Sequence, residues 1–467
     1  MVKRALLVST YDLGHQPFGL ASPAAWLRRE GVDVRCADLS KEKLTDEAAT
    51  EADLIAFHLP MHTATRLAGP VIRKVRMLNP AARLCAYGLY APLNEDWLRS
   101  LGIDEVLGGE FEEALAALAH GLPTSVCVTS DLKVRASNTP SVPKLHFIKP
   151  DRTGLLPLSR YATVHLGDGR RRIAGYTEAS RGCRHLCRHC PVVPIYSGQF
   201  RVVQQDVVLG DIATQVAGGA EHITFGDPDF FNGPTHAIRI VEALHDAHPS
   251  LSYDVTIKVE HLLQHIDLLP RLRDTGCLFV TTAVESIDDR VLRILEKGHT
   301  RADFIAAVDC CRQADLTLVP TFVAFHPWMS LEDYCDLLDT IAGLDLVDHV
   351  APIQLAIRLL IPRGSRLLEL DEVRTLASRF DPKTLSFLWS HPDPRVDALQ
   401  QEVAAIVGRR LTSHRREAFA AISAIAHERA GIACRGLSAT NSSRAVPYVD
   451  EPWYCCAEPN PEQLTLV

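Results

Sequence analysis

Short apolar runs alternate with amphipathic stretches along most of the chain. In residues 1–125, the apolar runs predict β-strands, and the stretches with apolar residues at helical spacing predict α-helices. The strands are expected near 5–8, 32–36, 54–57 and 83–87, and the helices near 19–30, 63–78, 93–101 and 111–120. Strands that alternate with helices are typical of a parallel sheet, so this region predicts an α/β, doubly wound, Rossmann-like domain with its binding crevice at the carboxyl ends of the strands.

The same alternation returns in a second block at residues 171–370. The expected strands lie near 173–178, 222–226, 252–259, 277–285, 316–325 and 350–360. Six βα units are two short of a closed eight-unit barrel, so this block predicts a partial (β/α)6 barrel. Its ligand site would gather at the carboxyl ends of the strands.

The remaining segments are assigned from their composition. Residues 126–170 are rich in proline, serine and polar residues, and Pro150 and Pro157 disfavour helix just before them, so we interpret this segment as a connector. Residues 371–445 carry helical patterns and predict a helical C-terminal region. Residues 446–467 form an irregular tail that contains two adjacent cysteines.

Composition narrows the class of protein. The chain has 467 residues, of which 47% are hydrophobic and 23% charged, which is typical of a globular protein with two or three domains. The net charge of −8 argues against a broad nucleic-acid surface. The first apolar run is too short for a signal peptide, and no apolar run is long enough to span a membrane. The 13 cysteines, an odd number without regular spacing, favour a cytoplasmic protein that uses thiolates over a secreted disulfide framework.

Three of these cysteines stand close together in the stretch SRGCRHLCRHCP. Cys183, Cys187 and Cys190 follow the first strand of the second block, in a loop at its carboxyl end. Thiolates at C-x3-C-x2-C spacing can hold three irons of a cubane cluster and leave the fourth iron open. A zinc site that adds His185 or His189 is the alternative, but ligands from one short loop would crowd the fourth tetrahedral position.

This spacing resembles the hallmark of the radical SAM superfamily, which is Cys-x3-Cys-x2-Cys on the loop after the first strand of a partial α/β barrel. The resemblance implies a [4Fe–4S] cluster whose open iron binds the amino and carboxylate groups of S-adenosyl-L-methionine (SAM). It also implies that an electron from a donor such as flavodoxin or ferredoxin is used to split a carbon–sulfur bond of the sulfonium. His189, where the family often has an aromatic residue, would lie against the adenine.

Weaker motifs extend the resemblance through most of residues 171–370. The segment around Asp227 and Asp229 ends the second strand where the family places an acidic motif for the amino group of SAM. Glu285 and Ser286 resemble the V-E-S motif of radical SAM methylthiotransferases, near the ribose and the carboxylate. The alternatives are an N-cap or Asx-turn at Asp227 and a helix cap at Glu285. Arg358, near the end of the sixth expected strand, would pair with a carboxylate in the cavity or extend along the surface.

Residues 1–125 resemble the cobalamin-binding domain that many of these relatives carry. The Asp-x-His-x-x-Gly signature that supplies a histidine to cobalt is absent, because His15 stands one place too late after Asp12. Many members bind cobalamin without that ligand. The sequence therefore leaves two alternatives for this domain: it binds cobalamin as a cofactor, or it is purely structural.

The tail contains Trp453-Tyr454-Cys455-Cys456-Ala457-Glu458-Pro459. It resembles the CUAEP/CCAEP-tail radical SAM proteins, a subgroup associated with arsenic metabolism and arsinothricin biosynthesis. The resemblance implies transfer of the 3-amino-3-carboxypropyl group of SAM to trivalent arsenic, with arsenite as the small-molecule substrate. Cys455 and Cys456 would hold the arsenic, since two adjacent thiolates can bind one soft centre. The alternative is a terminus whose cysteines are incidental.

Several functions compete at this stage. Within the radical SAM enzymes, the alternatives are a cobalamin-dependent methyltransferase and a hydrogen-abstracting enzyme. Outside them, the alternative is a non-catalytic iron–sulfur or thiol protein that carries electrons or sequesters metal. A redox carrier has no use for Asp227 or the Glu285-Ser286 pair, whereas a cofactor with amino, carboxylate and ribose groups needs such partners at the same end of the barrel.

Overall fold

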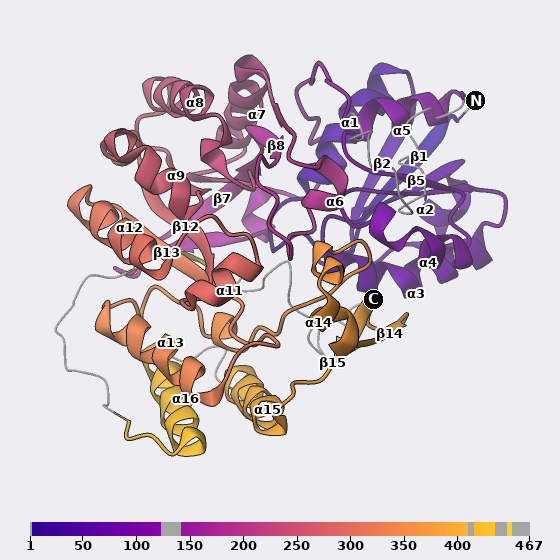
Figure 1. Cartoon of the computed structure of the whole chain (residues 1–467). Helices are drawn as coiled ribbons and strands as arrows, with labels where there is room; N and C mark the ends of the chain where they lie inside the picture. Colours follow the sequence, from indigo (N-terminus) through magenta and orange to yellow (C-terminus); the bar gives the residue numbers. More distant parts are fainter. Residues whose placement is uncertain (1, 123–141, 410–414, 435–445, 451–467) are drawn as a thin grey trace.

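The structure, a computed structural model, describes residues 2–122, 142–409, 415–434 and 446–450. Figure 1 shows an N-terminal domain, in indigo and purple, beside a larger domain whose strands and helices run from magenta to orange. The last two long helices, in orange and yellow, pack below the larger domain. No helix among the described residues is long and apolar enough to cross a bilayer.

The N-terminal domain is a five-stranded parallel sheet with the order β2-β1-β3-β4-β5. Its strands are β1 (Arg4–Ser9), β2 (Asp33–Asp38), β3 (Leu54–His58), β4 (Arg83–Tyr87) and β5 (Glu105–Leu107). Its helices are α1 (Phe18–Arg29), α2 (Asp46–Glu51), α3 (His62–Leu78), α4 (Glu95–Ser100) and α5 (Glu112–Ala119). The doubly wound fold and the four expected strands are confirmed. The short elements α2 and β5 were not expected, since neither is long enough to show a period.

Alternate residues of each strand supply two apolar layers, one on each face of this sheet. On one face, Leu7 packs with Leu20 of α1 and Leu115 of α5. On the other face, Leu6 packs with Ile72 of α3 and Leu98 of α4. Because both faces are covered by helices, the central strands β1, β3 and β4 are mainly apolar, as expected for a parallel sheet, whereas the edge strand β2 carries exposed charged residues.

The larger domain is a seven-stranded sheet with the order β13-β12-β11-β10-β7-β6-β16. Five of its strands run parallel: β7 (Arg171–Thr177), β10 (His222–Phe225), β11 (Ser252–Thr256), β12 (Cys277–Glu285) and β13 (Thr317–Phe322). At one end of the sheet, β6 (Thr163–His165) pairs antiparallel with β7, and the edge strand β16 (Tyr448–Val449) pairs antiparallel with β6. The outer helices are α7 (Gln205–Ala217), α8 (Pro234–Ala247), α9 (Val259–Gln264), α10 (Leu269–Asp274), α11 (Asp289–Ile294), α12 (Arg301–Gln313) and α13 (Leu331–Gly343).

Side-chain caps fix where two of the outer helices begin. Thr300 and Asp303 form a capping box at the start of α12, and Ser330 and Asp333 form another at the start of α13. Each box satisfies backbone N–H groups that the first helical turn leaves without partners. Both helices therefore begin just after the preceding loop at the carboxyl end of the sheet.

The structure corrects three details of the expected organisation. The sixth strand near 350–360 is absent: a 3-10 turn, Pro352–Leu355, takes its place, and only an isolated bridge joins Phe325 to Arg358. The segment expected to be a connector contributes β6, which pairs with β7. The region 371–445 contains a hairpin of β14 (Ala377–Asp381) and β15 (Ser386–Trp389) besides α14 (Asp371–Leu376), α15 (Pro394–Arg409) and α16 (Arg415–Ala430).

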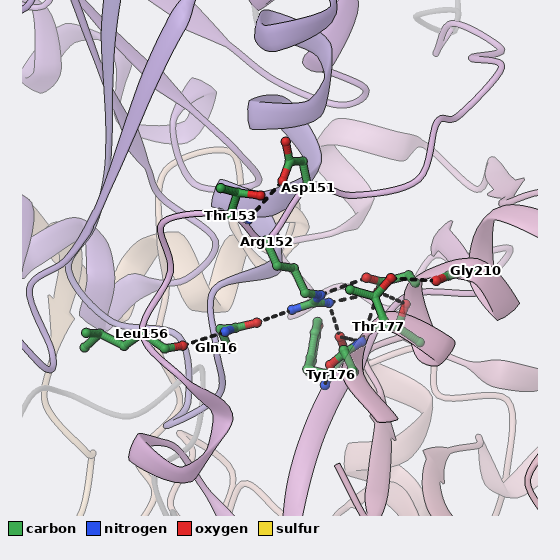
Figure 2. Close-up of polar contacts among 11 residues, drawn as sticks. Gln16, Asp151, Arg152, Thr153, Leu156, Tyr176, Thr177 and Gly210 are labelled. Atoms are coloured by element: carbon green, nitrogen blue, oxygen red, sulfur yellow. Dashed lines mark hydrogen bonds and ion pairs between the residues drawn. The ribbon is translucent and has the colours of Figure 1, made fainter. Parts of the chain in front are cut away.

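A buried arginine joins the two domains through the connector, as Figure 2 shows. Arg152 pairs with Asp211 of α7 through two N–H···O contacts of 2.7 and 2.8 Å. The same guanidinium donates to Gln16, in the loop after β1, and to the carbonyl of Tyr176 on β7. Because Asp211 balances its charge and the other acceptors bind its remaining N–H groups, the Arg152 guanidinium can be buried. It fixes the β1–α1 loop against the first strand of the barrel.

Candidate active site

The cysteine loop begins at a short strand that leaves the barrel sheet. After β7, the chain forms β8 (Ser180–Gly182), which pairs antiparallel with β9 (Phe200–Val202). Gly182 has a φ of 75°, and a Cβ there would lie 2.4 Å from the ring of Tyr196 and 2.5 Å from the carbonyl oxygen of Gln199. Only glycine fits, so the turn into Cys183 depends on it. The three cysteines lie between β8 and the short helix α6 (Val193–Tyr196).

The three thiols fit the ligand set of an iron–sulfur cluster. None of them is in a disulfide, and Cys187 is buried. Burial raises the pKa of the Cys190 thiol to about 12, and the neighbouring Cys187 and Cys183 thiols raise it further. Burial also raises the pKa of Cys183. Cys187 contributes to the raised pKa of both Cys183 and Cys190, so the three thiols lie close together, and Cys183 and Cys190 are held as neutral groups when no metal is bound. Iron would displace their protons, since the thiolate is the ligand.

The middle of the loop is anchored to the segment that follows β12. The backbone N–H of Arg188 donates to the carbonyl of Leu295, and its guanidinium donates to the carbonyl of Ile294 at the end of α11. The same side chain pairs with Glu296 at 2.6 Å. These contacts hold the loop at the carboxyl edge of the sheet, as its position after the first barrel strand predicts.

His189 meets Glu285 at this edge. Their Nε2 and Oε1 atoms are 3.1 Å apart, and Lys297 lies 3.5 Å from the same carboxylate oxygen. The charges of Lys297 and His189 hold the pKa of Glu285 at about 2, although burial acts in the opposite direction. Glu285 has a φ of 70°, which is uncommon for a residue with a side chain and typical of strained functional positions.

Asp227 braces the start of the cysteine loop. One carboxylate oxygen accepts from the backbone N–H of Ala179 at 2.9 Å, and the other accepts from the Ser180 hydroxyl at 2.5 Å. Its side chain is buried, which raises its pKa to about 7. Both oxygens thus have partners within the protein, as in the structural alternative for this residue. Its predicted role in SAM binding stays a prediction.

Asp229 lies at the centre of a second polar group. It is fully buried, and one oxygen accepts from the backbone N–H of Phe231. The other oxygen, Oδ2, is 2.6 Å from Nδ1 of His261 and 3.6 Å from Nε2 of His185. Asp229 is therefore a buried carboxylate directed toward the cysteine loop, where the resemblance places an acceptor for the amino group of SAM.

Ser286 and Arg358 are placed differently from Glu285. The Ser286 hydroxyl accepts from the backbone N–H of Asp288, so it stabilises the turn before α11. Arg358 pairs with Asp397 of α15 at 2.6 Å, donates to the carbonyl of Trp389 and stacks on its ring. Its guanidinium is engaged by the C-terminal region. The roles predicted for both residues in cofactor binding stay predictions.

A small, partly open hollow lies beside His189. Arg358 and the backbone of the following residues line it from the barrel, and Tyr90 lines it from the N-terminal domain. The hollow thus brings together two of the predicted site residues and opens at the junction of the two domains. Such junctions are frequent positions for small-molecule sites.

A buried arginine cluster lies immediately before the cysteines. Arg181 pairs with Glu178 at 2.6 Å, with Glu112 at 2.7 Å and with Glu110 at 2.8 Å. Glu110 and Glu112 belong to the N-terminal domain, whereas Arg181 lies two residues before Cys183. Burial raises the pKa of Glu110 to about 7. The N-terminal domain is therefore in direct contact with the strand that begins the cysteine loop.

Sequence reasoning missed several of these residues. Lys297, His261, Arg181 and the two glutamates of the N-terminal domain are distant from the cysteines in sequence or outside any short motif. The only available signal was their position, since Lys297 follows the helix after β12 and His261 follows β11 at the same edge of the sheet. Cys455 and Cys456, the two predicted catalytic residues, lie outside the described residues.

Comparison with known protein families identifies the barrel. The family model described as the radical SAM superfamily matches residues 177–341. The chain is 27% identical over 190 residues to ribosomal protein uS12 methylthiotransferase RimO of Desulfosudis oleivorans, covering 38% of this chain and 41% of that protein. It is 25% identical over 185 residues to tRNA-2-methylthio-N(6)-dimethylallyladenosine synthase of Haemophilus influenzae, covering 36% and 38%. The chain thus spans about two fifths of the length of these relatives.

Two solved structures are similar in fold to both domains together. The cobalamin-dependent SAM radical enzyme OxsB, with aqua-cobalamin and SAM bound, aligns with a TM-score of 0.69 at 13% identity, covering 92% of this chain and 72% of that chain. The radical SAM methyltransferase TsrM from Kitasatospora setae, with cobalamin and a [4Fe–4S] cluster bound, aligns with a TM-score of 0.56 at 19% identity, covering 74% and 71%. The matched family model begins six residues before Cys183. Residues 177–341 are therefore the part of the chain that matches the radical SAM superfamily, and the three clustered cysteines lie near the beginning of the match.

Proposed function

We propose that this protein is an enzyme that cleaves SAM reductively at a [4Fe–4S] cluster held by Cys183, Cys187 and Cys190. The observation that carries the proposal is the set of three free thiols on one loop, at the edge of the barrel that also presents Glu285 and Asp229. When bound, the cluster supplies one electron to the sulfonium and leaves one iron for SAM.

The surrounding side chains match the groups of SAM. Asp229 offers a buried carboxylate to an ammonium, which needs a charged acceptor when it leaves water. Glu285 offers acceptor oxygens to ribose hydroxyls, and the ring of His189 beside it offers a flat surface to the adenine. Lys297 and Lys258, both buried at the same edge, provide positive charge for a carboxylate.

We further propose that the group transferred is the 3-amino-3-carboxypropyl group and that its acceptor is trivalent arsenic, in a reaction of the arsinothricin-biosynthesis type. The support is the adjacent pair Cys455 and Cys456 in the C-terminal tail. Two neighbouring thiolates bind a soft, three-coordinate centre well and would deliver arsenite to the barrel.

Cobalamin-dependent methyl transfer is the second candidate. It is favoured by the fold similarity to OxsB and TsrM, which hold cobalamin in their structures. The residues of this chain fit a corrinoid less well. At the carboxyl ends of β1 and β3, Thr10, His15 and His58 are buried, and the His58 ring packs against Gly19 so closely that no Cβ fits there. These side chains at the strand ends are packed against the protein itself, so we place methyl transfer second.

The nucleoside product distinguishes the candidates. Anaerobic, reconstituted protein is incubated with SAM and reductant, with and without arsenite, and the product is identified by mass spectrometry. Methylthioadenosine that increases with arsenite is the expected result. If 5′-deoxyadenosine dominates and arsenite has no effect, the acceptor is wrong, and a cobalamin-binding assay then tests the second candidate. A Cys187→Ala variant that turns over SAM as fast as the unmodified chain would remove the enzyme proposal altogether.

A further inference from the structure

Polar atoms converge next to Cys183 without hydrogen bonds of acceptable geometry. Nε2 of His185, Oδ2 of Asp229 and Nδ1 of His261 are all buried atoms of this kind. The carboxylate oxygen is 3.6 Å from the first nitrogen and 2.6 Å from the second. Buried polar atoms almost always have partners. Oδ2 of Asp229 and Nδ1 of His261 face each other at ion-pair distance, whereas Nε2 of His185 is a buried atom without a hydrogen bond and faces the same carboxylate.

The donor set is that of a zinc-type site. Sγ of Cys183 and the ligand atoms of His185 and Asp229 all lie within 4.8 Å of one another. Zinc binds thiolate sulfur at ~2.3 Å and imidazole nitrogen or carboxylate oxygen at ~2.0–2.2 Å. Donors around one such ion are therefore separated by less than ~4.5 Å, so a small contraction of this group would close it around a single ion.

Two further residues orient these donors. Nδ1 of His185 faces Oε2 of Glu260 at 3.6 Å, so the histidine can present Nε2 to a metal while its other nitrogen faces a carboxylate. His261 lies against the carboxylate of Asp229. Partners of this kind, which hold a ligand in the correct tautomer and direction, are typical of protein zinc sites.

We propose that the cluster-free chain binds one divalent cation of the zinc class through Cys183, His185 and Asp229, and that this ion and the iron–sulfur cluster exclude each other. The reason is that both need the single thiolate of Cys183. The inference does not depend on the proposed SAM chemistry, because it concerns the chain before the cluster is assembled. Asp229 would serve the cation in that state and the ammonium of SAM in the loaded state.

Metal binding by cluster-free protein tests the site. The full chain, in a Cys455→Ser/Cys456→Ser background that removes the tail thiols, is titrated with Zn²⁺ against a chromogenic chelator and with Co²⁺ as a spectroscopic probe. One ion per chain and a thiolate-to-cobalt charge-transfer band are expected. Asp229→Asn and His185→Gln should abolish tight binding. Glu260→Gln and His261→Gln should weaken it about 10- to 100-fold.

The two other cysteines provide matched controls. Cys187→Ser and Cys190→Ser should lose cluster assembly and keep the zinc site, whereas Asp229→Asn should lose zinc and still assemble the cluster. One equivalent of Zn²⁺ should inhibit cluster reconstitution in the unmodified chain and have no effect in Asp229→Asn.

Two results would overturn the inference. The first is zinc binding that survives both Asp229→Asn and His185→Gln. The second is zinc binding that disappears with Cys187→Ser, because the ion would then be held by the cysteine loop alone. A chain that binds zinc as described but never cleaves SAM would contradict only the proposed function, so the two failures can be told apart.

Discussion

Nε2 of His189 and Oε1 of Glu285 lie 3.1 Å apart, and this contact ties the cysteine loop to the end of strand β12. Nζ of Lys297 lies 3.5 Å from the same oxygen, so the carboxylate interacts with both a histidine and a buried ammonium. Glu285 is held in the left-handed region by these partners and by the register shift between β12 and β13. Strain of this kind persists only where the surroundings impose it, which favours a functional role for Glu285.

Glu285→Gln should therefore weaken SAM binding while the cluster still assembles. The amide keeps the shape of the side chain but leaves the Lys297 ammonium without a charged partner. A buried charge without its partner costs about 3–5 kcal/mol, so the variant should also unfold at lower denaturant concentration. Equilibrium dialysis against reconstituted protein measures SAM affinity, the iron content per chain measures cluster assembly, and denaturant unfolding measures stability. Glu242→Gln is the control. Glu242 pairs with Arg271 on the surface, so its loss should leave SAM affinity, iron content and stability unchanged.

The low pKa of Glu285 predicts how stability falls in acid. The carboxyl has a pKa of about 2 in the folded protein and of ~4.3 in an unfolded chain. The stability that this carboxylate contributes is fully present above the pKa of the unfolded chain. It is lost as the pH falls toward 2, because the unfolded state binds the proton more readily than the folded state. Unfolding midpoints measured from pH 6 down to 3 should decrease less in Glu285→Gln than in the unmodified chain. Parallel curves would contradict the ion pair.

Asp227 predicts the opposite trend at higher pH. Its carboxyl has a pKa of about 7 in the folded protein because it is buried, so between about pH 4 and 7 the folded state holds a proton that the unfolded state releases. Stability contributed by this group therefore decreases as the pH rises across that window. Asp227→Asn should remove the decrease, since its amide can accept from the Ala179 N–H and donate to the Ser180 hydroxyl. A pH profile unchanged by the substitution would mean that Asp227 does not titrate there.

The parallel sheets were predictable because their signal is local. The strands β1, β3 and β4 each contain a continuous apolar run, and long amphipathic helices follow β1 and β3. The strand prediction for 350–360 was wrong because it relied on the same local signal. The segment is apolar and long enough for a strand, but Pro352 begins a 3-10 turn within it, and only Arg358 forms a bridge, to Phe325. Apolar composition reports burial, and burial alone does not require strand pairing.

The candidate site was predictable only where a motif is short. The three cysteines stand within eight positions, so their joint chemistry is visible in the sequence. The partners of Glu285 and Asp229 are different. Lys297 lies 12 residues after Glu285, beyond α11, and His261 comes from the βα unit that follows the one containing Asp229. Arg181 and Glu110 are 71 residues apart, and no pattern along the chain indicates that they touch.

The arginine cluster before the cysteines predicts a strong effect on stability. Arg181 is buried among three carboxylates, two of them from the N-terminal domain. Arg181→Met keeps much of the apolar stem but leaves these acids without a counter-charge, so the free energy of unfolding should decrease by about 3–5 kcal/mol. Urea unfolding followed by circular dichroism measures this loss.

A surface pair provides the matched control for Arg181. Arg170 pairs with Asp168 in an exposed turn, and Arg170→Met should leave the same free energy of unfolding almost unchanged, because water screens an exposed ion pair. Equal effects of the two substitutions would contradict the interdomain role of Arg181. If Arg181→Met is too unstable to purify, Arg181→Lys keeps the charge and loses the planar fork, and it should show an intermediate decrease.

The tail cysteines provide the decisive test of the acceptor. If Cys455 and Cys456 hold arsenite, Cys455→Ser/Cys456→Ser should lose arsenite-dependent methylthioadenosine and keep the cluster and SAM affinity, because the barrel residues are untouched. Serine is nearly isosteric but binds soft arsenic poorly, so the variant separates ligation from shape. The control is Cys310→Ser/Cys311→Ser, a second adjacent pair that lies within α12 and should leave the product unchanged if it folds. Full arsenite-dependent turnover by the tail variant would contradict the proposal that Cys455 and Cys456 bind the arsenic.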